Sequence, residues 1–268
     1  MVIGFIGCGN MGGAIIGGIV GSRMIQSGRI IISDKDEAKV EALKEKYNVI
    51  GTSDNAKVAH DSDILFICVK PNKVEEVAEK IRERLKMDSI IVSIAAGKKI
   101  SDLQSYFGED KNIIRAMPNT PALVGEGMTA LSICKRLGNK EYKERLDFIN
   151  KIFDALGRCA VVPESMMDAV TGISGSSPAY VFMFIEAMAD AAVRAGMTRK
   201  TAYIFAAQAV LGSAKMVLET EKHPAELKDM VCSPAGTTID AVKILEDGGF
   251  RGVIMDAVDA CVKKSSEM

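Results

Sequence analysis

The chain has 268 residues, of which 48% are hydrophobic, so it is long enough to bury a sizeable core and to form two domains. Its 34 basic and 35 acidic residues give a net charge of −1, which disfavours nucleic-acid and membrane-surface partners and favours a small molecule. No apolar run approaches the roughly 18 residues that span a bilayer, and the opening residues do not resemble a secretion signal, so we expect a cytoplasmic protein, with an organelle matrix as the alternative.

The chain opens on a short apolar strand, Val2 to Ile6, which runs into Gly7, Gly9 and Gly12 and then a helical pattern. Gly7 would permit a tight turn, Gly9 would let backbone amides approach a pyrophosphate, and Gly12 would let the helix pack close to the sheet. A helix amino terminus at this point favours negative charge. The motif therefore predicts a dinucleotide phosphate site, and the alternative is a glycine-rich turn that serves packing only.

A second strand, Ile30 to Ser33, ends in Asp34, about 20 residues beyond the last glycine. An acid at this place accepts hydrogen bonds from the adenosine ribose. A 2′-phosphate would be repelled by about 4 kcal/mol at a surface-like dielectric and 4 Å separation, and by about 1 kcal/mol in bulk water. Asp34 therefore predicts a preference for NADH. Lys35 follows directly and offsets this repulsion, which predicts residual use of NADPH.

Strands and helical patterns then alternate as in a doubly wound sheet. We predict helices at about 37–46, 73–85 and 140–156, strands near 49 and at 63–69, 89–94, 113–117, 128–133 and 159–162, and a capping box at Ser101 and Gln104.

Past Pro163 the composition changes to Ala, Met and Gly, which predicts helices at about 168–195, 199–221, 224–230 and 237–264. We therefore expect an α/β Rossmann domain with a mostly parallel sheet over residues 1–163, and an all-α domain over residues 164–268. The apolar surface of the helical part is generous for its length and favours oligomerisation.

Ligands of open parallel sheets bind at the carboxyl ends of the strands. Three such ends read Val69-Lys70-Pro71, Ala95-Ala96-Gly97 and Met117-Pro118-Asn119. We expect Lys70 and Asn119 to offer polar groups near the nicotinamide, and the alternative for each is ordinary turn chemistry.

A later segment, SPAGTT over 233–238, brings backbone and hydroxyl donors together at a helix start. Ser233 can cap this helix and Pro234 suits its first turn, while Gly236, Thr237 and Thr238 add donors. The segment predicts a carboxylate pocket without a cationic side chain, and the alternative is an ordinary N-cap.

The chain resembles the pyrroline-5-carboxylate reductase family over essentially its whole length. The resemblance rests on GFIGCGNMG, the VKP and AAG loops, RAMPNTPALVGEGMTAL, DAVTGISGSSPAYVF, LKDMVCSPAGTTIDAV and GGFRG. It implies reduction of 1-pyrroline-5-carboxylate to proline with NADH or NADPH, by a Rossmann domain with a helical dimerisation domain. It also implies homodimers that assemble into decamers, with a site shared between subunits.

The resemblance and the motifs together give one set of site residues. Thr238 is the catalytic candidate, with its hydroxyl near the ring nitrogen, and the substrate contacts are Glu164, Ser233, Gly236, Thr237 and Thr238. The cofactor contacts are Ile6, Gly7, Cys8, Gly9, Asn10, Met11, Asp34, Lys35, Asn55, Val69, Lys70, Pro71, Ala96 and Asn119. Two positions depart from the family: Met230 replaces an asparagine that contacts ligand in some members, and Thr237 is often alanine.

Reduction of a protonated cyclic imine mainly requires that the ring carbon be held against the nicotinamide, so no strong acid is demanded. The alternatives are another imine or β-hydroxyacid reductase, which the lack of a lysine after Gly172 and Gly175 disfavours, and a non-catalytic dinucleotide-sensing module. The six scattered cysteines form no C-x-x-C pair, and only His60 and His223 could join them, so we expect no metal site.

Overall fold

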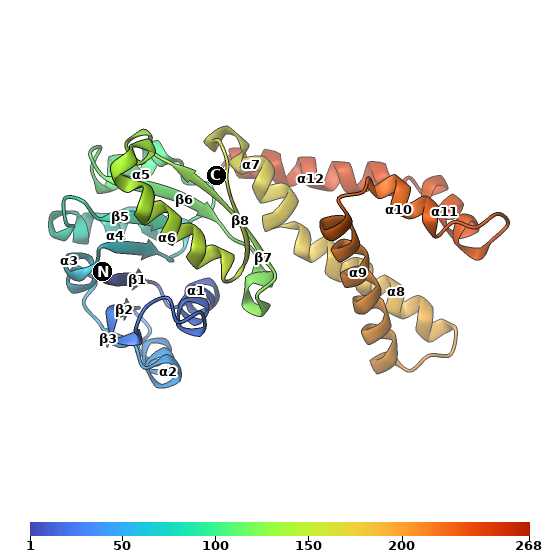
Figure 1. The fold of residues 1–268 in the computed structure, drawn as a ribbon, viewed down its shortest axis with the longest axis horizontal. Helices are drawn as coiled ribbons and strands as arrows, with labels where there is room; N and C mark the ends of the chain where they lie inside the picture. Colours follow the sequence, from blue (N-terminus) through green and yellow to red (C-terminus); the bar gives the residue numbers. More distant parts are fainter. The chain divides into compact units, whose positions relative to one another are not determined.

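The computed structural model describes residues 1–268, which form two compact units. The first unit comprises Met1–Ser176 together with Cys261–Met268, and the second comprises Ser177–Ala260. Figure 1 shows the sheet of the first unit and the long helices of the second.

The first unit is built on one eight-stranded sheet with the order β3-β2-β1-β4-β5-β6-β7-β8. Every neighbouring pair is parallel except β6 and β7, so the expected doubly wound, mostly parallel Rossmann sheet is confirmed. The strands are β1 Ile3–Ile6, β2 Ile30–Ser33, β3 Ile50–Thr52, β4 Ile64–Ile67, β5 Ile90–Ser93, β6 Asn112–Met117, β7 Gly127–Ile133 and β8 Gly157–Val161.

The central strands carry the core because both of their faces are covered. All residues of β1, β2, β4 and β5 are buried, and most are isoleucine, whose branched side chains suit a two-sided sheet. The rings of Phe5 and Phe66 stack with their centroids 4.7 Å apart, and Phe153 meets Phe66 edge-on.

The helices between the strands lie in two layers, one on each face of the sheet. One layer holds α1 Asn10–Gly21, α2 Glu37–Tyr47 and α6 Lys143–Asp154, and the other holds α3 Asn55–Asp61, α4 Val74–Ile81 and α5 Ile100–Phe107. Short 3₁₀ turns lie at Ser27–Arg29, Pro71–Lys73, Arg82–Arg84, Thr120–Val124, Lys135–Gly138, Lys140–Tyr142 and Glu164–Met166.

Two helix starts differ from expectation. The expected capping box at Ser101 and Gln104 was wrong. The N-cap of α5 is Lys99, two residues earlier, so the helix begins at Ile100, and the Lys99 N–H donates to Asp102. The short helix α3 was not anticipated, although Asp54 caps it by accepting from the Ala56 N–H.

The residues that follow β8, up to Ser176, still belong to the first unit. A short helix, α7 Met167–Val170, continues into a π-turn at Thr171–Gly175, so the expected single helix over 168–195 is broken. The compact units separate after Ser176, and the domain boundary after Pro163 stays a prediction.

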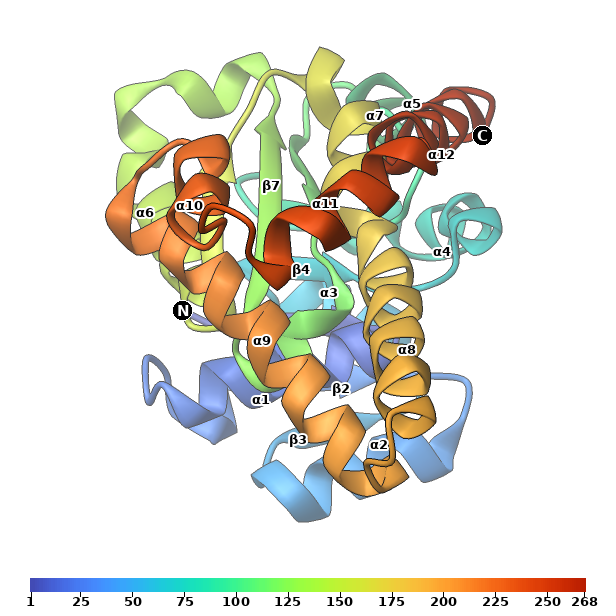
Figure 2. The ribbon, with the colours of Figure 1, turned by 90° about the vertical axis from the view of Figure 1, so that its right-hand side faces the viewer.

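The second unit consists of helices. They are α8 Ser177–Arg194, α9 Arg199–Thr220, α10 Pro224–Met230, α11 Thr237–Asp247 and most of α12 Phe250–Ser266. A turn at Gly196, with φ of +98°, joins α8 and α9 into a helical hairpin, and Figure 2 shows the two side by side. The expected helix over 237–264 is divided because Gly249 adopts a φ of +70°.

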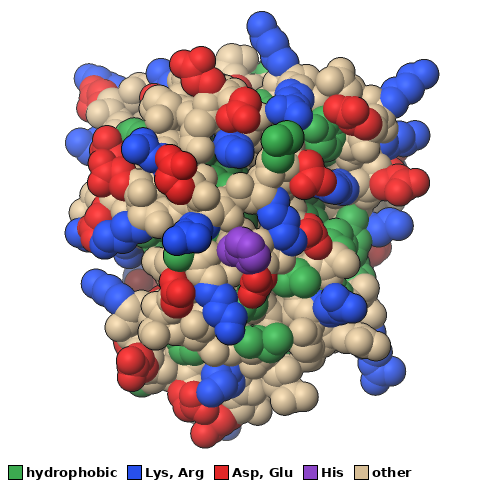
Figure 3. Space-filling view, turned by 90° about the vertical axis from the view of Figure 1, so that its left-hand side faces the viewer, with side chains coloured by type: hydrophobic (Ala, Val, Ile, Leu, Met, Phe, Trp, Pro, Cys, Tyr) green, Lys and Arg blue, Asp and Glu red, His purple; other side chains and the backbone are tan.

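Helix α9 is long and apolar enough to cross a membrane by length and composition alone, contrary to the expectation that no apolar segment approaches that length. Helices of soluble proteins that pack against other helices meet the same criterion. On the face of the molecule drawn in Figure 3, Lys and Arg side chains are interspersed with Asp and Glu side chains, in keeping with a net charge of −1.

Candidate active site

The glycine loop joins the end of β1 to the start of α1. Gly7 has a φ of +107°, and a Cβ there would lie 2.6 Å from the backbone carbonyl of Cys68. A Cβ at Gly12 would overlap the carbonyl oxygen of Gly7, whereas a Cβ at Gly9 would meet no atom within 4 Å. Gly7 and Gly12 are therefore required by close approach, as expected, and Gly9 faces open space.

No side chain caps the amino terminus of α1, where Gly9 is the N-cap residue. The first-turn amides of Asn10 and Met11 thus face no side-chain acceptor from this chain, and the helix dipole favours an anion there. The open space at Gly9 together with these amides fits the diphosphate of a dinucleotide.

Asp34 braces this loop. Its Oδ2 accepts from the Cys8 N–H at 2.6 Å, and its Oδ1 accepts from the Asp36 N–H at 2.9 Å. The Cys8 amide therefore points to Asp34 and not to a phosphate. Each carboxylate oxygen keeps a second lone pair that a ribose hydroxyl can use.

Three other expected cofactor contacts, Asn55, Lys35 and Cys8, lie close to Asp34 in the sequence or the fold. Asn55 is the first residue of α3, and its Oδ1 accepts from the Ser33 hydroxyl at 2.7 Å. Lys35 is exposed. Burial, followed by the charge of Asp34, raises the pKa of the Cys8 thiol to about 12.

The strand order brings the expected loops to one edge of the sheet. Strands β1, β4, β5 and β6 are neighbours and parallel, so the glycine loop, Lys70, Ala96 and Asn119 follow adjacent carboxyl ends. Val69 and Pro71 flank Lys70, whose exposed ammonium has no carboxylate partner.

Asn119 is engaged by backbone groups on both sides of its amide. Its Nδ2 donates to the Ser174 carbonyl at 3.0 Å, and its Oδ1 accepts from the Met128 N–H at 2.9 Å. These bonds fit the alternative of turn chemistry, and its role toward the cofactor stays a prediction.

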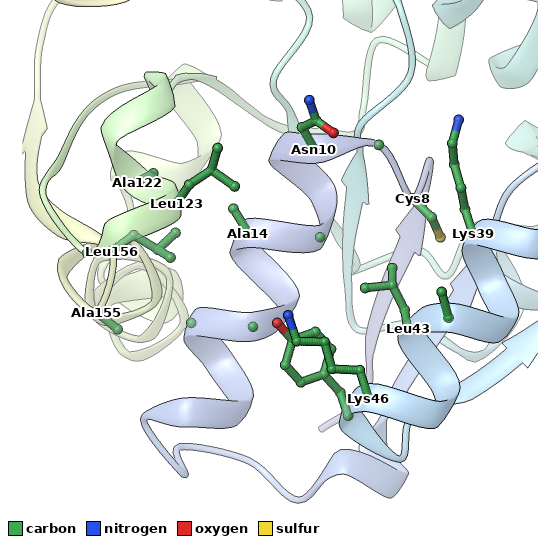
Figure 4. A pocket seen from close by; sticks show the side chains of 17 residues that line it. Cys8, Asn10, Ala14, Lys39, Leu43, Lys46, Ala122, Leu123, Ala155 and Leu156 are labelled. Atoms are coloured by element: carbon green, nitrogen blue, oxygen red, sulfur yellow. The ribbon is translucent and has the colours of Figure 1, made fainter. Parts of the chain in front are cut away.

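A groove of about 650 Å³ runs along α1 between α2 and the Thr120–Val124 turn (Figure 4). Its floor is the small-residue face of α1, and its walls include Lys39, Leu43, Leu123 and Leu156. The groove touches the glycine loop at Cys8 to Asn10 but does not include Lys70, Ala96 or Asn119. It therefore lies outside the nicotinamide end of the site.

Glu164 belongs to the first unit and is firmly held. Its Oε1 accepts from the Ile100 N–H at 2.6 Å and lies 3.5 Å from Arg115 Nη1. The same guanidinium lies 3.8 Å from Asp168 Oδ1 through Nη2. Sequence reasoning missed Arg115 and Asp168, although a charged residue inside the buried strand pattern NIIRAM was an available signal.

The SPAGTT segment lies in the second unit and differs from expectation in its details. Gly236 is the N-cap of α11, and Thr237 and Thr238 are its first two residues. Ser233 is therefore not the cap, and Pro234 precedes the helix, because residues 233–236 form a turn in which the Gly236 N–H donates to the Ser233 carbonyl at 3.0 Å. No side chain caps α11, so its first-turn donors face no side-chain acceptor.

Known proteins match the chain over nearly its full length. It is 51% identical over 266 residues to pyrroline-5-carboxylate reductase of Escherichia coli K12, covering 99% of this chain and 97% of that protein. It is 42% identical to the Arabidopsis thaliana enzyme of the same name, covering 99% and 95%. The chain belongs to the pyrroline-5-carboxylate reductase family.

Family models and solved structures agree with this membership. Residues 164–268 match the model described as pyrroline-5-carboxylate reductase dimerisation, and residues 2–97 match that of NADP oxidoreductase, coenzyme F420-dependent. A Coxiella burnetii pyrroline-5-carboxylate reductase structure has a TM-score of 0.91 at 34% identity, covering 99% of this chain and 97% of that chain. The Plasmodium falciparum pyrroline carboxylate reductase with NADP bound has a TM-score of 0.89 at 32% identity, covering 100% and 97%.

Proposed function

We propose that this chain reduces 1-pyrroline-5-carboxylate to L-proline with NADH or NADPH, the last step of proline biosynthesis. The observation that carries the proposal is the 51% identity over 99% of the chain to a reductase of that name. The open glycine loop at the amino terminus of α1 supports it independently, because its geometry fits a dinucleotide.

The roles of the residues follow from the chemistry. The reduced nicotinamide, when bound, supplies a hydride for the imine carbon, and the ring nitrogen ends as an amine. The α1 amides and Asp34 hold the dinucleotide. The Ser233 hydroxyl and the Thr237 N–H would bind the ring carboxylate, and the Thr238 hydroxyl would lie near the ring nitrogen. The Gly236 N–H, which we expected among these donors, is already used, because it donates to the Ser233 carbonyl.

The substrate needs little acid catalysis, since a protonated imine is already electrophilic. The protein must bring the ring carbon against the nicotinamide and exclude water. We therefore propose that positioning is the larger contribution, and that Thr238 or Glu164 assists proton movement.

Three finer properties belong to the same proposal. The dimerisation match over 164–268 supports a homo-oligomer, and we propose that its dimers assemble into a decamer in the cytoplasm. Asp34 favours NADH, with residual use of NADPH. A comparison of kcat/KM for the two coenzymes tests this preference, and a strong preference for NADPH would show that Lys35 governs the pocket.

The direct test adds pyrroline-5-carboxylate to purified protein with reduced coenzyme and measures coenzyme oxidation and proline. We expect Thr238→Ala to lose about 100-fold in kcat with the coenzyme KM unchanged, the scale of one lost proton-handling group. Thr237→Ala is the matched control, since the residue 237 backbone N–H survives, and it should stay within about threefold of wild type. Wild-type protein that forms no proline would overturn the proposal.

A further inference from the structure

Arg115 is the only charged residue among the buried ones. It lies in β6, opposite Ser93 of β5 and Ser132 of β7, and its side chain is 6% exposed. A guanidinium is protonated at every physiological pH, so a buried one requires carboxylates to balance its charge.

Two carboxylates balance this charge, and each has a second donor. Glu164 Oε1 also accepts from the Ile100 N–H, and Asp168 Oδ1 also accepts from the Ser265 hydroxyl at 2.7 Å. One arginine therefore joins β6 to the segment after β8 and to the last turn of α12. All of these residues lie within the first unit.

The two oxygens of Glu164 differ in what they contact. Oε1 is held by Arg115 and by Ile100, whereas Oε2 makes no hydrogen bond within the chain. The side chain is 35% exposed, so the free oxygen is accessible to a ligand. An ordered carboxylate with one free oxygen is suited to a cationic N–H group, which both a protonated cyclic imine and its amine product present.

We propose that Arg115 is a positioning residue for the substrate: with the Ile100 amide it fixes Glu164 so that Oε2 balances the positive charge of the ring nitrogen. The inference rests on the proposed function, which supplies the cyclic imine. Asp168 also contacts Arg115, but its Oδ1 accepts from the Ser265 hydroxyl. Asp168 therefore contributes to the stability of the first unit.

The test measures KM for pyrroline-5-carboxylate and for NADH separately in wild type, Arg115→Gln, Glu164→Gln and the double variant. We expect each single variant to raise the imine KM about tenfold, with the NADH KM within twofold of wild type. If Arg115 acts through Glu164, the double variant is no worse than the poorer single variant within about twofold.

Asp168→Asn is the matched control, because it removes one carboxylate from the same arginine without touching Glu164. It should lower the melting temperature and leave the imine KM within twofold. Arg115→Lys keeps the charge but not the planar fork, so it should recover part of the imine KM, and it replaces Arg115→Gln if that variant does not fold.

The outcomes separate the inference from the proposed function. Wild type that does not reduce the imine refutes the function itself. An active wild type whose Arg115 and Glu164 losses multiply, or whose Asp168→Asn variant raises the imine KM as much as the Arg115 variant does, refutes the positioning role alone.

Discussion

At the scale of single residues, Gly12 is where the fold leaves least room in the coenzyme loop. A methyl group there would overlap the Gly7 carbonyl, and the loop would have to move. We expect Gly12→Ala to lower the free energy of unfolding by about 1–3 kcal/mol, the usual cost of overpacking, and to weaken coenzyme binding.

Gly21 is the matched control, because it ends the same helix and a Cβ there meets nothing within 4 Å. Gly21→Ala should be neutral or stabilising by up to about 1 kcal/mol. Urea unfolding and coenzyme titration measure both variants, and equal behaviour of the two would contradict the close packing of Gly12.

The Cys8 thiol should react slowly with alkylating reagents in the folded protein. Burial and the charge of Asp34 raise the pKa of its thiol to about 12, so only about 1 in 10,000 molecules carries the reactive thiolate at pH 8. Alkylation of Cys8 should therefore be about 1,000-fold slower than in the urea-unfolded chain, where the pKa is near 9.0.

Because the thiolate is the nucleophile, the rate should rise about tenfold per pH unit between pH 8 and pH 11 in the folded protein. Peptide mass spectrometry after timed iodoacetamide treatment measures it. A rate that is flat with pH, or equal in the folded and unfolded chains, would exclude a raised pKa.

At the scale of elements, the sequence predicted the sheet better than the details of the helices. Continuous apolar runs such as ILFI give strands buried on both faces. Strand β6 ends directly before Pro118, as expected, whereas β4 ends at Ile67, two residues before its expected end. The helix α3 was missed because seven residues are too few to establish a helical period. The π-turn before α8 was also missed, since it depends on tertiary packing and not on composition.

The residues of the site could be predicted from the sequence only where they are close together in the chain. The glycine loop and Asp34 have fixed local spacing, so sequence placed them correctly beside each other. The contacts of Arg115 with Glu164 and Asp168, and of Asp168 with Ser265, join residues that are far apart in the sequence, with 97 positions between Asp168 and Ser265. No local sequence pattern contains that information. The bonds of Asn119 to distant backbone groups were hidden in the same way.

The helices of the second unit expose many large apolar side chains in the single chain, including Phe182, Ile204, Phe205 and Leu218. Phe205 on α9 is 63% exposed. A charge placed in a packed interface remains unpaired, so Phe205→Glu should weaken self-association by at least about 100-fold.

Light scattering after size exclusion measures this effect. Asn139→Glu, which adds the same charge at an exposed position of the first unit, should keep the wild-type mass. A Phe205→Glu protein with unchanged mass would show that this part of α9 does not contribute to the dimer.

At the scale of the whole molecule, the fold assigns different tasks to different segments. The sheet gathers the glycine loop, Lys70 and Ala96 along one edge, and the uncapped start of α11 offers donors for an anion. Full-length similarity to reductases of one name indicates one reaction for the whole chain. The near-zero net charge is compatible with a small-molecule substrate.

The proposed function requires that hydride pass from the coenzyme to the imine carbon of pyrroline-5-carboxylate. The most direct measurement supplies NADH deuterated at nicotinamide C4, separately on each face, and analyses the proline by mass spectrometry and NMR. We expect one deuterium at the ring carbon that is bonded to nitrogen and does not carry the carboxylate, and only from one face of the nicotinamide. Proline without deuterium from either coenzyme, or deuterium at another carbon, would contradict it.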